Sequence, residues 1–237
     1  MTADARSILA QLEVVERERA TRSVDPALVA TVLALKSYQQ RRFAATYADL
    51  LASSRYAPAA RFFLDELYGP RDFSSRDAQF ARVVPAMVRL FPAEIVSTVQ
   101  TLADLHALSE TLDTLMARHL LGRAIDRVSY TDAWQRTGNA AQRERQIALT
   151  LVVGSDLDRL TRKPLLRGAL HMMRGPARAA GLPALQAFLE VGFDTFKAMG
   201  GAAEFLSTVG SRERALAKAL FDARIESPFD ASLGQLP

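Results

Sequence analysis

Residues 92–122, PAEIVSTVQTLADLHALSETLDTLMARHLLG, carry the apolar pattern that decides the fold. Apolar side chains recur there every three or four positions, at Ile95, Val99, Leu102, Leu105, Leu108, Leu112 and Leu115. They fall on one face of an α-helix, because the helix has about 3.6 residues per turn. Pro92 at the start and Gly122 at the end are typical helix boundaries. The stretch therefore predicts one long helix at the centre of the core.

Similar spacing continues along the rest of the chain. No stretch as long as a β-strand shows the alternation of apolar and polar residues that is typical of strands. The segment 147–153 is rich in β-branched residues and fits either a strand or a helix, but the polar helix-forming residues before it favour a helix. Three further helices are predicted in the first part of the chain: 26–52 after the cap Asp25, 58–68 before Gly69-Pro70, and 74–91, which is capped by Ser74 with Asp77 and kinked at Pro85. Two more begin at Ser129, with Asp132 completing the cap, and at Asn139. Several shorter helices follow Pro164, and the last of them spans 211–224.

These signals predict an all-α, single-domain, multi-helix bundle. No polar linker divides the chain, so residues 1–225 are expected to form one helical domain, with 1–22 as a peripheral N-terminal helix. Residues 226–237 contain prolines, a glycine and few apolar groups, and a flexible tail is expected there.

Composition excludes several classes of protein. The chain of 237 residues has no cysteine, so disulfides, iron–sulfur clusters and thiol nucleophiles are excluded. The longest apolar run, residues 27–35, is about half the roughly 20 residues that a membrane span needs, and the N-terminus has no signal-peptide core. We therefore expect a cytoplasmic protein. The common nucleotide, metalloprotease and hydrolase motifs are absent, and we expect no cofactor and no metal site.

A motif at residues 62–68, FFLDELY, is followed by a Gly-Pro turn and a run of alternating charge. One interpretation places the phenylalanines in the core and pairs the charges at the surface. The other makes the motif an aromatic pocket wall with a polar lining. The candidate ligand- or partner-binding residues are Phe63, Glu66, Tyr68, Arg71, Asp72, Arg76 and Asp77.

The same motif resembles that of a bacterial family named for the sequence FFLEELY, from which it differs by Asp65 in place of Glu. The stretches 76–85, 173–177 and 185–193 also look like that family, so the resemblance covers about residues 47–213. It implies no activity, cofactor or catalytic residue for this chain.

Two further features have two readings each. His106, Glu110 and Asp113 share one helical face, which is typical of a solvated polar face and also fits an acid–base site, whereas His119 continues the leucine stripe and is expected in the core. Gly192 in the middle of a helix indicates close helix packing or room for an apolar ligand.

Residues 134–178 carry an excess of basic side chains over acidic ones. Salt bridges on a solvated face explain this, and so does a patch that binds nucleic acid or lipid headgroups, with Arg167, Arg174 and Arg178 as the candidate anion-binding residues.

The leading functional hypothesis is a non-catalytic module that binds a protein partner or an apolar small molecule. The alternatives are an enzyme whose acid–base site combines carboxylates of the FFLDELY region with His106, and a binder of anionic surfaces.

Overall fold

The computed structural model describes residues 4–67, 70, 73–224 and 233–237. In these ranges it contains twelve α-helices, one π-helix and no β-strand, so the predicted all-α multi-helix bundle is confirmed.

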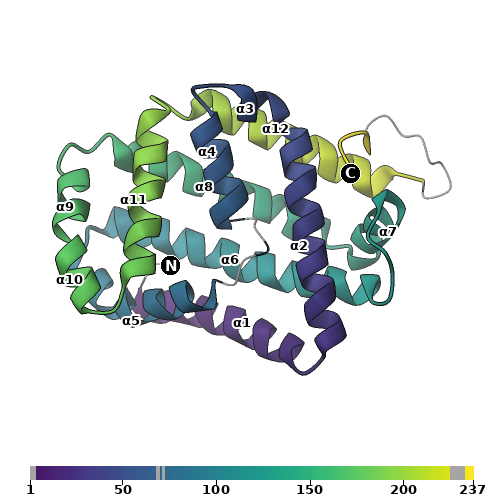
Figure 1. Ribbon diagram of the computed structural model, residues 1–237, viewed down its shortest axis with the longest axis horizontal. Coiled ribbons are helices and arrows are strands. Elements are labelled where there is room, and N and C mark those ends of the chain that lie inside the picture. The colour runs from purple at the N-terminus through teal and green to yellow at the C-terminus, as the bar shows by residue number, and fades with distance from the viewer. Residues whose placement is uncertain (1–3, 68–69, 71–72, 225–232) are drawn as a thin grey trace.

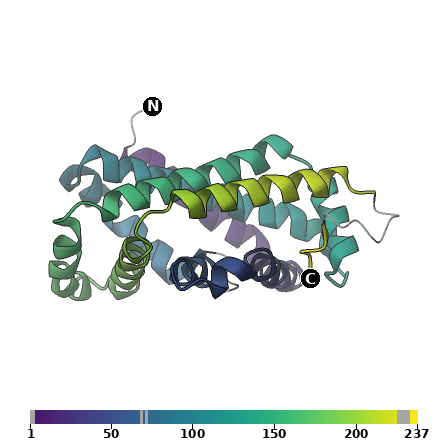
Figure 2. The same ribbon diagram turned by 90° about the horizontal axis from the view of Figure 1, so that it is seen from above.

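Two layers of helices make up most of the bundle (Figures 1 and 2). The first layer consists of α6 (Ala93–Leu120), α8 (Ala140–Thr161) and α12 (Ala203–Asp222), which run side by side. The second layer, α2 (Pro26–Thr46), α4 (Ala57–Phe62) and α11 (Pro183–Ala198), crosses the first. Each layer buries its apolar stripe against the other, and the core lies between them.

The remaining helices close the edges of this arrangement. Along one edge of α6 lie α1 (Ala5–Ser23) and α5 (Ser74–Leu90), and α7 (Arg127–Thr137) closes one end. The other short elements are α3 (Ala48–Ala52), the π-helix η1 (Phe63–Leu67), α9 (Leu166–Met172) and α10 (Arg174–Ala179).

The predicted central helix is confirmed as α6, which packs against α1, α2, α7 and α8. Its residues Leu112, Met116 and Leu120 are completely buried. The segment 147–153 lies inside α8 and is helical, as expected.

The N-terminal helix, which was predicted to be peripheral, lies along one edge of α6 and buries one face. Ile8, Leu12 and Val15 of α1 are buried, and the first two join a cluster with Val84 and Val96 of α5 and α6. Their spacing of three to four residues gives α1 an apolar face, which the many charges of this segment conceal in the sequence.

Several predicted helix boundaries differ from the structure. The helix predicted over 26–52 is broken at Tyr47, whose ring is buried and whose hydroxyl donates a hydrogen bond to Glu213 of α12 (2.8 Å). The cap position of α5 is Phe73, and Ser74 is the first residue of the helix rather than its cap. The cap of α7 is Asp126 with Ser129 rather than Ser129 with Asp132. The pair Asp126–Ser129, which begins three residues before the predicted pair Ser129–Asp132, therefore satisfies free N–H groups at the start of that helix.

The last five residues return to the core. Leu233 and Leu236 are buried beside α2 and α7, and the Tyr38 hydroxyl donates to the carbonyl oxygen of Pro237 (3.2 Å). The flexible tail predicted for 226–237 is therefore wrong for 233–237, since two leucines suffice to anchor it, and residues 226–232 lie outside the described part of the chain.

Candidate functional site

A cavity of about 210 Å³ lies between the two helix layers. Side chains from α2, α5, α6, α7, α8, α11 and α12 line it. An apolar cavity of about 150 Å³ is large enough to hold benzene, so this space can hold a small organic molecule.

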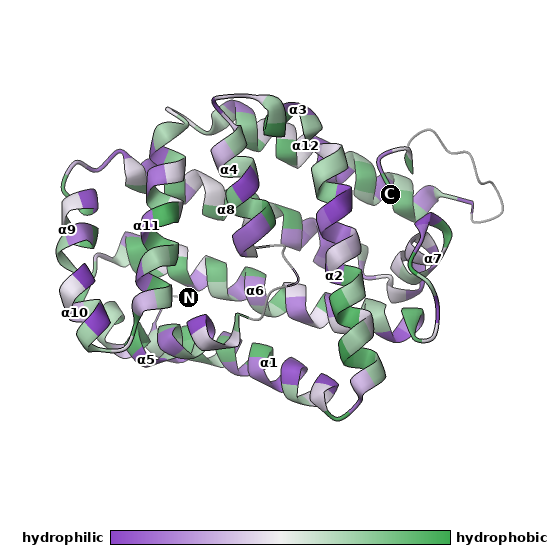
Figure 3. Ribbon diagram, viewed as in Figure 1, coloured by the Kyte–Doolittle hydropathy of each residue, from purple (hydrophilic) through white to green (hydrophobic). Residues whose placement is uncertain are grey.

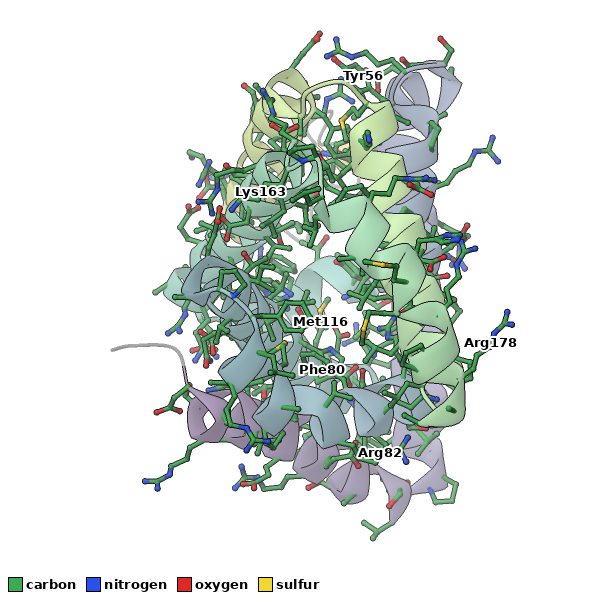
Figure 4. All side chains as sticks on the ribbon, turned by 90° about the vertical axis from the view of Figure 1, so that its left-hand side faces the viewer. Tyr56, Phe80, Arg82, Met116, Lys163 and Arg178 are labelled. Carbon is green, nitrogen blue, oxygen red and sulfur yellow. The ribbon has the colours of Figure 1, made fainter. Side chains whose placement is uncertain are left out.

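One part of the cavity lining is mostly apolar, with the guanidinium of Arg76 stacked on Phe188 among the apolar side chains. The apolar side chains are Val99 and Leu102 of α6, Phe80 of α5, and Leu185 and Phe188 of α11. Hydrophobic residues dominate α11, as its green colour in Figure 3 shows. In the view along the long axis, Phe80 lies near the middle of the molecule (Figure 4).

The other end of the cavity carries most of the polar side chains, among apolar ones such as Ile147 and Leu216. Along α6 the lining changes from Val99 and Leu102 to Ser109, Glu110 and Asp113. The facing helices add six further polar residues at this end: Lys36, Gln39 and Arg42 of α2, Arg143 and Gln146 of α8, and Glu213 of α12.

Glu110 is the centre of the ion pairs at the polar end. It accepts hydrogen bonds from Arg22 (2.6 Å) and Lys36 (2.5 Å), and its side chain is only 5% exposed. Burial alone would raise the pKa of Glu110, but the charges and hydrogen bonds of Lys36 and Arg22 lower it to about 2. Glu110 is therefore ionised at neutral pH.

Asp113, one turn further along α6, behaves in the opposite way. Burial raises its pKa, although Lys36 lies 3.9 Å away and Gln39 donates a hydrogen bond to it (3.1 Å). Two neighbouring carboxyl groups in one cavity thus have pKa values shifted in opposite directions, which is typical of sites that bind or transfer protons.

Trp134 lies at the polar end of the cavity. Its indole Nε1 is buried and has no hydrogen-bond acceptor within the described residues. The guanidinium carbon of Arg143 lies 4.0 Å from the centroid of the Trp134 ring. Arg143 also donates to Gln146 (3.2 Å) and contacts the sulfur of Met116 (3.7 Å). A positive charge and a buried N–H donor therefore lie side by side.

A histidine–aspartate pair lies about midway along α6. His106 Nε2 and Asp77 Oδ2 are 2.9 Å apart, and Arg19 of α1 donates to the same oxygen (2.6 Å). Burial raises the pKa of Asp77, but His106 and Arg19 lower it overall, so Asp77 is ionised. In the tautomer that donates from Nε2 to Asp77, Nδ1 of His106 is the acceptor nitrogen, and it makes no hydrogen bond within the described residues.

The structure brings together part of the predicted FFLDELY site. Phe63, Arg76 and Asp77 line the cavity, and the guanidinium of Arg76 lies 3.5 Å from the Glu66 carboxylate. Arg76 also stacks on Phe188, with 4.4 Å between guanidinium carbon and ring centroid. Tyr68, Arg71 and Asp72 lie outside the described residues.

The prediction of a solvated face for His106, Glu110 and Asp113 is wrong. The two carboxylates are buried, because Arg22 and Lys36 from other helices neutralise Glu110 inside the protein. His119, predicted in the core, is exposed near the end of α6. A Cβ atom on Gly192 would lie 3.0 Å from Cζ of Phe62, so this glycine serves close packing of α11 on α4.

Several lining residues were missed from the sequence: Lys36, Gln39, Arg42, Arg143 and Glu213. Gln39 continues the apolar stripe of Leu28, Val32 and Leu35, and Glu213 lies between Val209 and Leu216 on another stripe. A polar residue at a position where the helical spacing predicts an apolar one could have indicated these buried polar side chains.

The predicted anion-binding residues lie at the surface, away from the cavity lining. Arg167 donates twice to Asp194 (2.7 and 3.0 Å), and Arg174 forms a two-oxygen pair with Glu190. Arg178 projects away from the molecule (Figure 4). The carboxylates offset two of the three charges, and an anion site there stays a prediction.

The described residues contain neither a metal-binding cluster nor a membrane-spanning helix. No group of three or more histidine, aspartate or glutamate side chains is placed to hold a metal ion. No helix in the described ranges is long and apolar enough to cross a membrane.

Comparisons with known proteins place the chain in a family without assigning it a function. No curated protein and no solved structure matches it. A family model described as "Domain of unknown function (DUF8198)" matches residues 18–227, which include every helix that lines the polar end of the cavity. The chain therefore belongs to the DUF8198 family.

Proposed function

We propose that this chain binds a small apolar molecule in the central cavity. The supporting observation is the cavity itself, about 210 Å³ in volume and lined by aromatic and aliphatic side chains from both helix layers. Close-packed protein interiors contain few voids larger than a water molecule, so a space of this size at the centre of a bundle is typical of a ligand site. This favours the small-molecule part of the leading hypothesis over the protein-partner part.

The experiment uses Trp134, the one tryptophan of the chain, as a reporter in the cavity wall. Titration with 1-decanol should shift its emission and raise the melting temperature. The variant Val153→Phe fills part of the cavity, because Val153 lines it, and should bind 1-decanol at least tenfold more weakly. The matched control is Val152→Phe, the same change at a neighbouring exposed position, which should bind as the wild type does.

Circular dichroism must show that both variants are folded. Should Val153→Phe not fold, Val99→Phe in the mostly apolar part of the lining replaces it. Equal affinity of the cavity and control variants for 1-decanol, or no response of the wild type, would contradict the proposal.

A second candidate is an enzyme that moves protons on the bound molecule, supported by the His106–Asp77 pair beside the cavity. Nδ1 of His106 would accept a proton from a carbon next to a carbonyl group, and Asp77 would stabilise the resulting imidazolium. The test is the exchange of the α-protons of 2-decanone with D₂O. It should be faster with the wild type than with His106→Gln at equal binding, and equal rates would remove this candidate.

Two assignments made from the sequence belong to the proposal. The FFLDELY stretch supports membership of the FFLEELY-motif family within the broader family, and the absence of cysteine supports a cytoplasmic location. Native mass spectrometry of protein isolated from its own host would test the binding proposal directly, since a co-purifying molecule adds a discrete mass.

A further inference from the structure

The segment 159–189 concentrates the positive charge of the chain. Its 31 residues include six basic residues and no aspartate or glutamate. The rest of the chain carries 24 basic and 26 acidic residues, a net charge of −2, so the net charge of +4 comes from this segment. The segment forms the end of α8, the helices α9 and α10 and the start of α11, at one end of the molecule (Figure 1). A negatively charged partner is therefore attracted to this end.

Helices α9 and α10 contribute almost nothing to the core. Ala177 is the one buried residue in the range 162–184, and no residue of α9 is buried. A helix of a globular protein normally buries an apolar stripe against its neighbours. Most of the surface of α9 and α10 therefore faces outward and is available to a partner.

Large apolar side chains are exposed on α9. Leu165 and Met172 lie seven positions apart, which is two helical turns, so they point to the same side. Hydrogen bonds from Ala169 N–H to the Leu165 carbonyl (3.0 Å) and from Met173 N–H to the Ala169 carbonyl (3.1 Å) maintain the helical spacing over this range. The two side chains are 83% and 74% exposed. Such side chains gain free energy when they leave water for an apolar phase.

Basic side chains lie beside this apolar line. Arg167 and Arg174 are also two turns apart, and each pairs with a carboxylate of α11, Asp194 or Glu190. The arginine side chains stay 56% and 50% exposed, and a carboxylate occupies only some of the guanidinium donors, so both arginines can also reach a phosphate. Arg178 projects away from the molecule (Figure 4).

We propose that α9 and α10 dock on a membrane surface that contains anionic phospholipids. Leu165 and Met172 enter the boundary between headgroups and acyl chains, and the three arginines lie at the phosphates. Interfacial helices bind through this combination of apolar area and attraction to anionic lipids. This inference goes beyond the proposed function and does not depend on the cavity.

Nucleic acid fits the same surface less well. Phosphates of nucleic acid would attract the arginines, but they leave the exposed leucine and methionine in water. Residues 135–187 contain no aromatic side chain on which a base could stack.

Sedimentation of the full chain with lipid vesicles tests this inference. One set of vesicles is phosphatidylcholine alone, and the other contains about one third phosphatidylserine. We expect at least tenfold tighter binding to the anionic vesicles at about 0.01 M salt. This preference should largely disappear at about 1 M salt, where the Debye length is only about 3 Å.

Two variants of the docking surface have matched controls. Arg178→Gln should weaken binding about fivefold, as for one basic residue near an anionic surface, and Leu165→Gln about tenfold. The controls are Arg118→Gln, at an exposed position of α6 near α7, and Val24→Gln, at an 84% exposed position between α1 and α2. Both of these regions lie away from α9 (Figure 1), so the controls should bind as the wild type does.

The remaining outcomes contradict the proposal. No binding at low salt, or equal binding to both kinds of vesicle, would overturn it, and so would equal losses for Leu165→Gln and Val24→Gln. Binding to a DNA duplex that is as tight as to anionic vesicles and unchanged in Leu165→Gln would assign the surface to nucleic acid instead. Circular dichroism must show that each variant is folded, and Met172→Gln replaces Leu165→Gln should that variant not fold.

Discussion

The substitution Glu110→Gln tests the buried ion pairs at the polar end of the cavity. It keeps the size of the side chain but removes the charge that compensates Arg22 and Lys36. The pKa of Glu110 falls from its ordinary value of 4.5 to about 2, and this difference corresponds to about 3 kcal/mol of stability at neutral pH. Mutational studies of buried pairs give a similar loss of about 3–5 kcal/mol when one partner is removed.

The expected effect is measurable and depends on pH. For a chain of this size, about 3 kcal/mol lowers the melting temperature by about 6–12 °C. Because the folded-state pKa of Glu110 is depressed, its contribution is complete above the unfolded value of 4.5 and is lost as the pH falls toward about 2. The difference between wild type and variant should therefore be full at pH 7 and shrink below about pH 4.5.

Guanidinium unfolding, followed by circular dichroism and by Trp134 emission, measures these free energies. The control is Glu144→Gln, which removes a comparable pair with Arg214 at the surface (2.7 Å) and should cost less than about 1 kcal/mol. If Glu110→Gln and Glu144→Gln destabilised the protein equally, or if the loss did not depend on pH, the assignment of stability to the buried pairs would be refuted.

Two further substitutions test packing. Gly192→Val should destabilise the folded protein by about 1–3 kcal/mol, because the valine side chain would meet the ring of Phe62. The control is Gly168→Val, because a Cβ atom at that position meets nothing within 4 Å. Equal urea midpoints of the two variants would contradict the close approach of Gly192 to Phe62. Leu236→Ala should destabilise by about 2–5 kcal/mol, because Leu236 is buried in the core, and a change near zero in the same assay would show that the chain end is not anchored.

The helices were predictable because their signal is local. The stripe in α6 depends on residues three or four positions apart, and it predicted a central helix that the structure confirms. Boundaries were less predictable where two similar signals compete. Ser129 is flanked by Asp126 and Asp132, each three residues away, and only the structure shows that Asp126 forms the capping pair.

The cavity was not predictable because its partners are distant in the sequence. Glu110 and Arg22 are separated by 88 positions, and nothing local indicates that they meet. Charged residues are rarely buried unless they are paired, so Glu110 and Asp113 alone are expected at the surface. Burial became possible only through α1 and α2, and the charged sequence of α1 conceals its role in the core.

The distribution of these buried charges favours a functional origin over a structural one. Buried ion pairs often stabilise a protein no more than apolar residues of the same volume would. A bundle of this length has ample apolar surface elsewhere, in three hydrophobic clusters, and does not need Arg22, Lys36 and Glu110 for its core. Lys36 and Glu110 instead lie in the cavity lining, and Arg22 pairs with Glu110. Placed there, they make this part of the space polar.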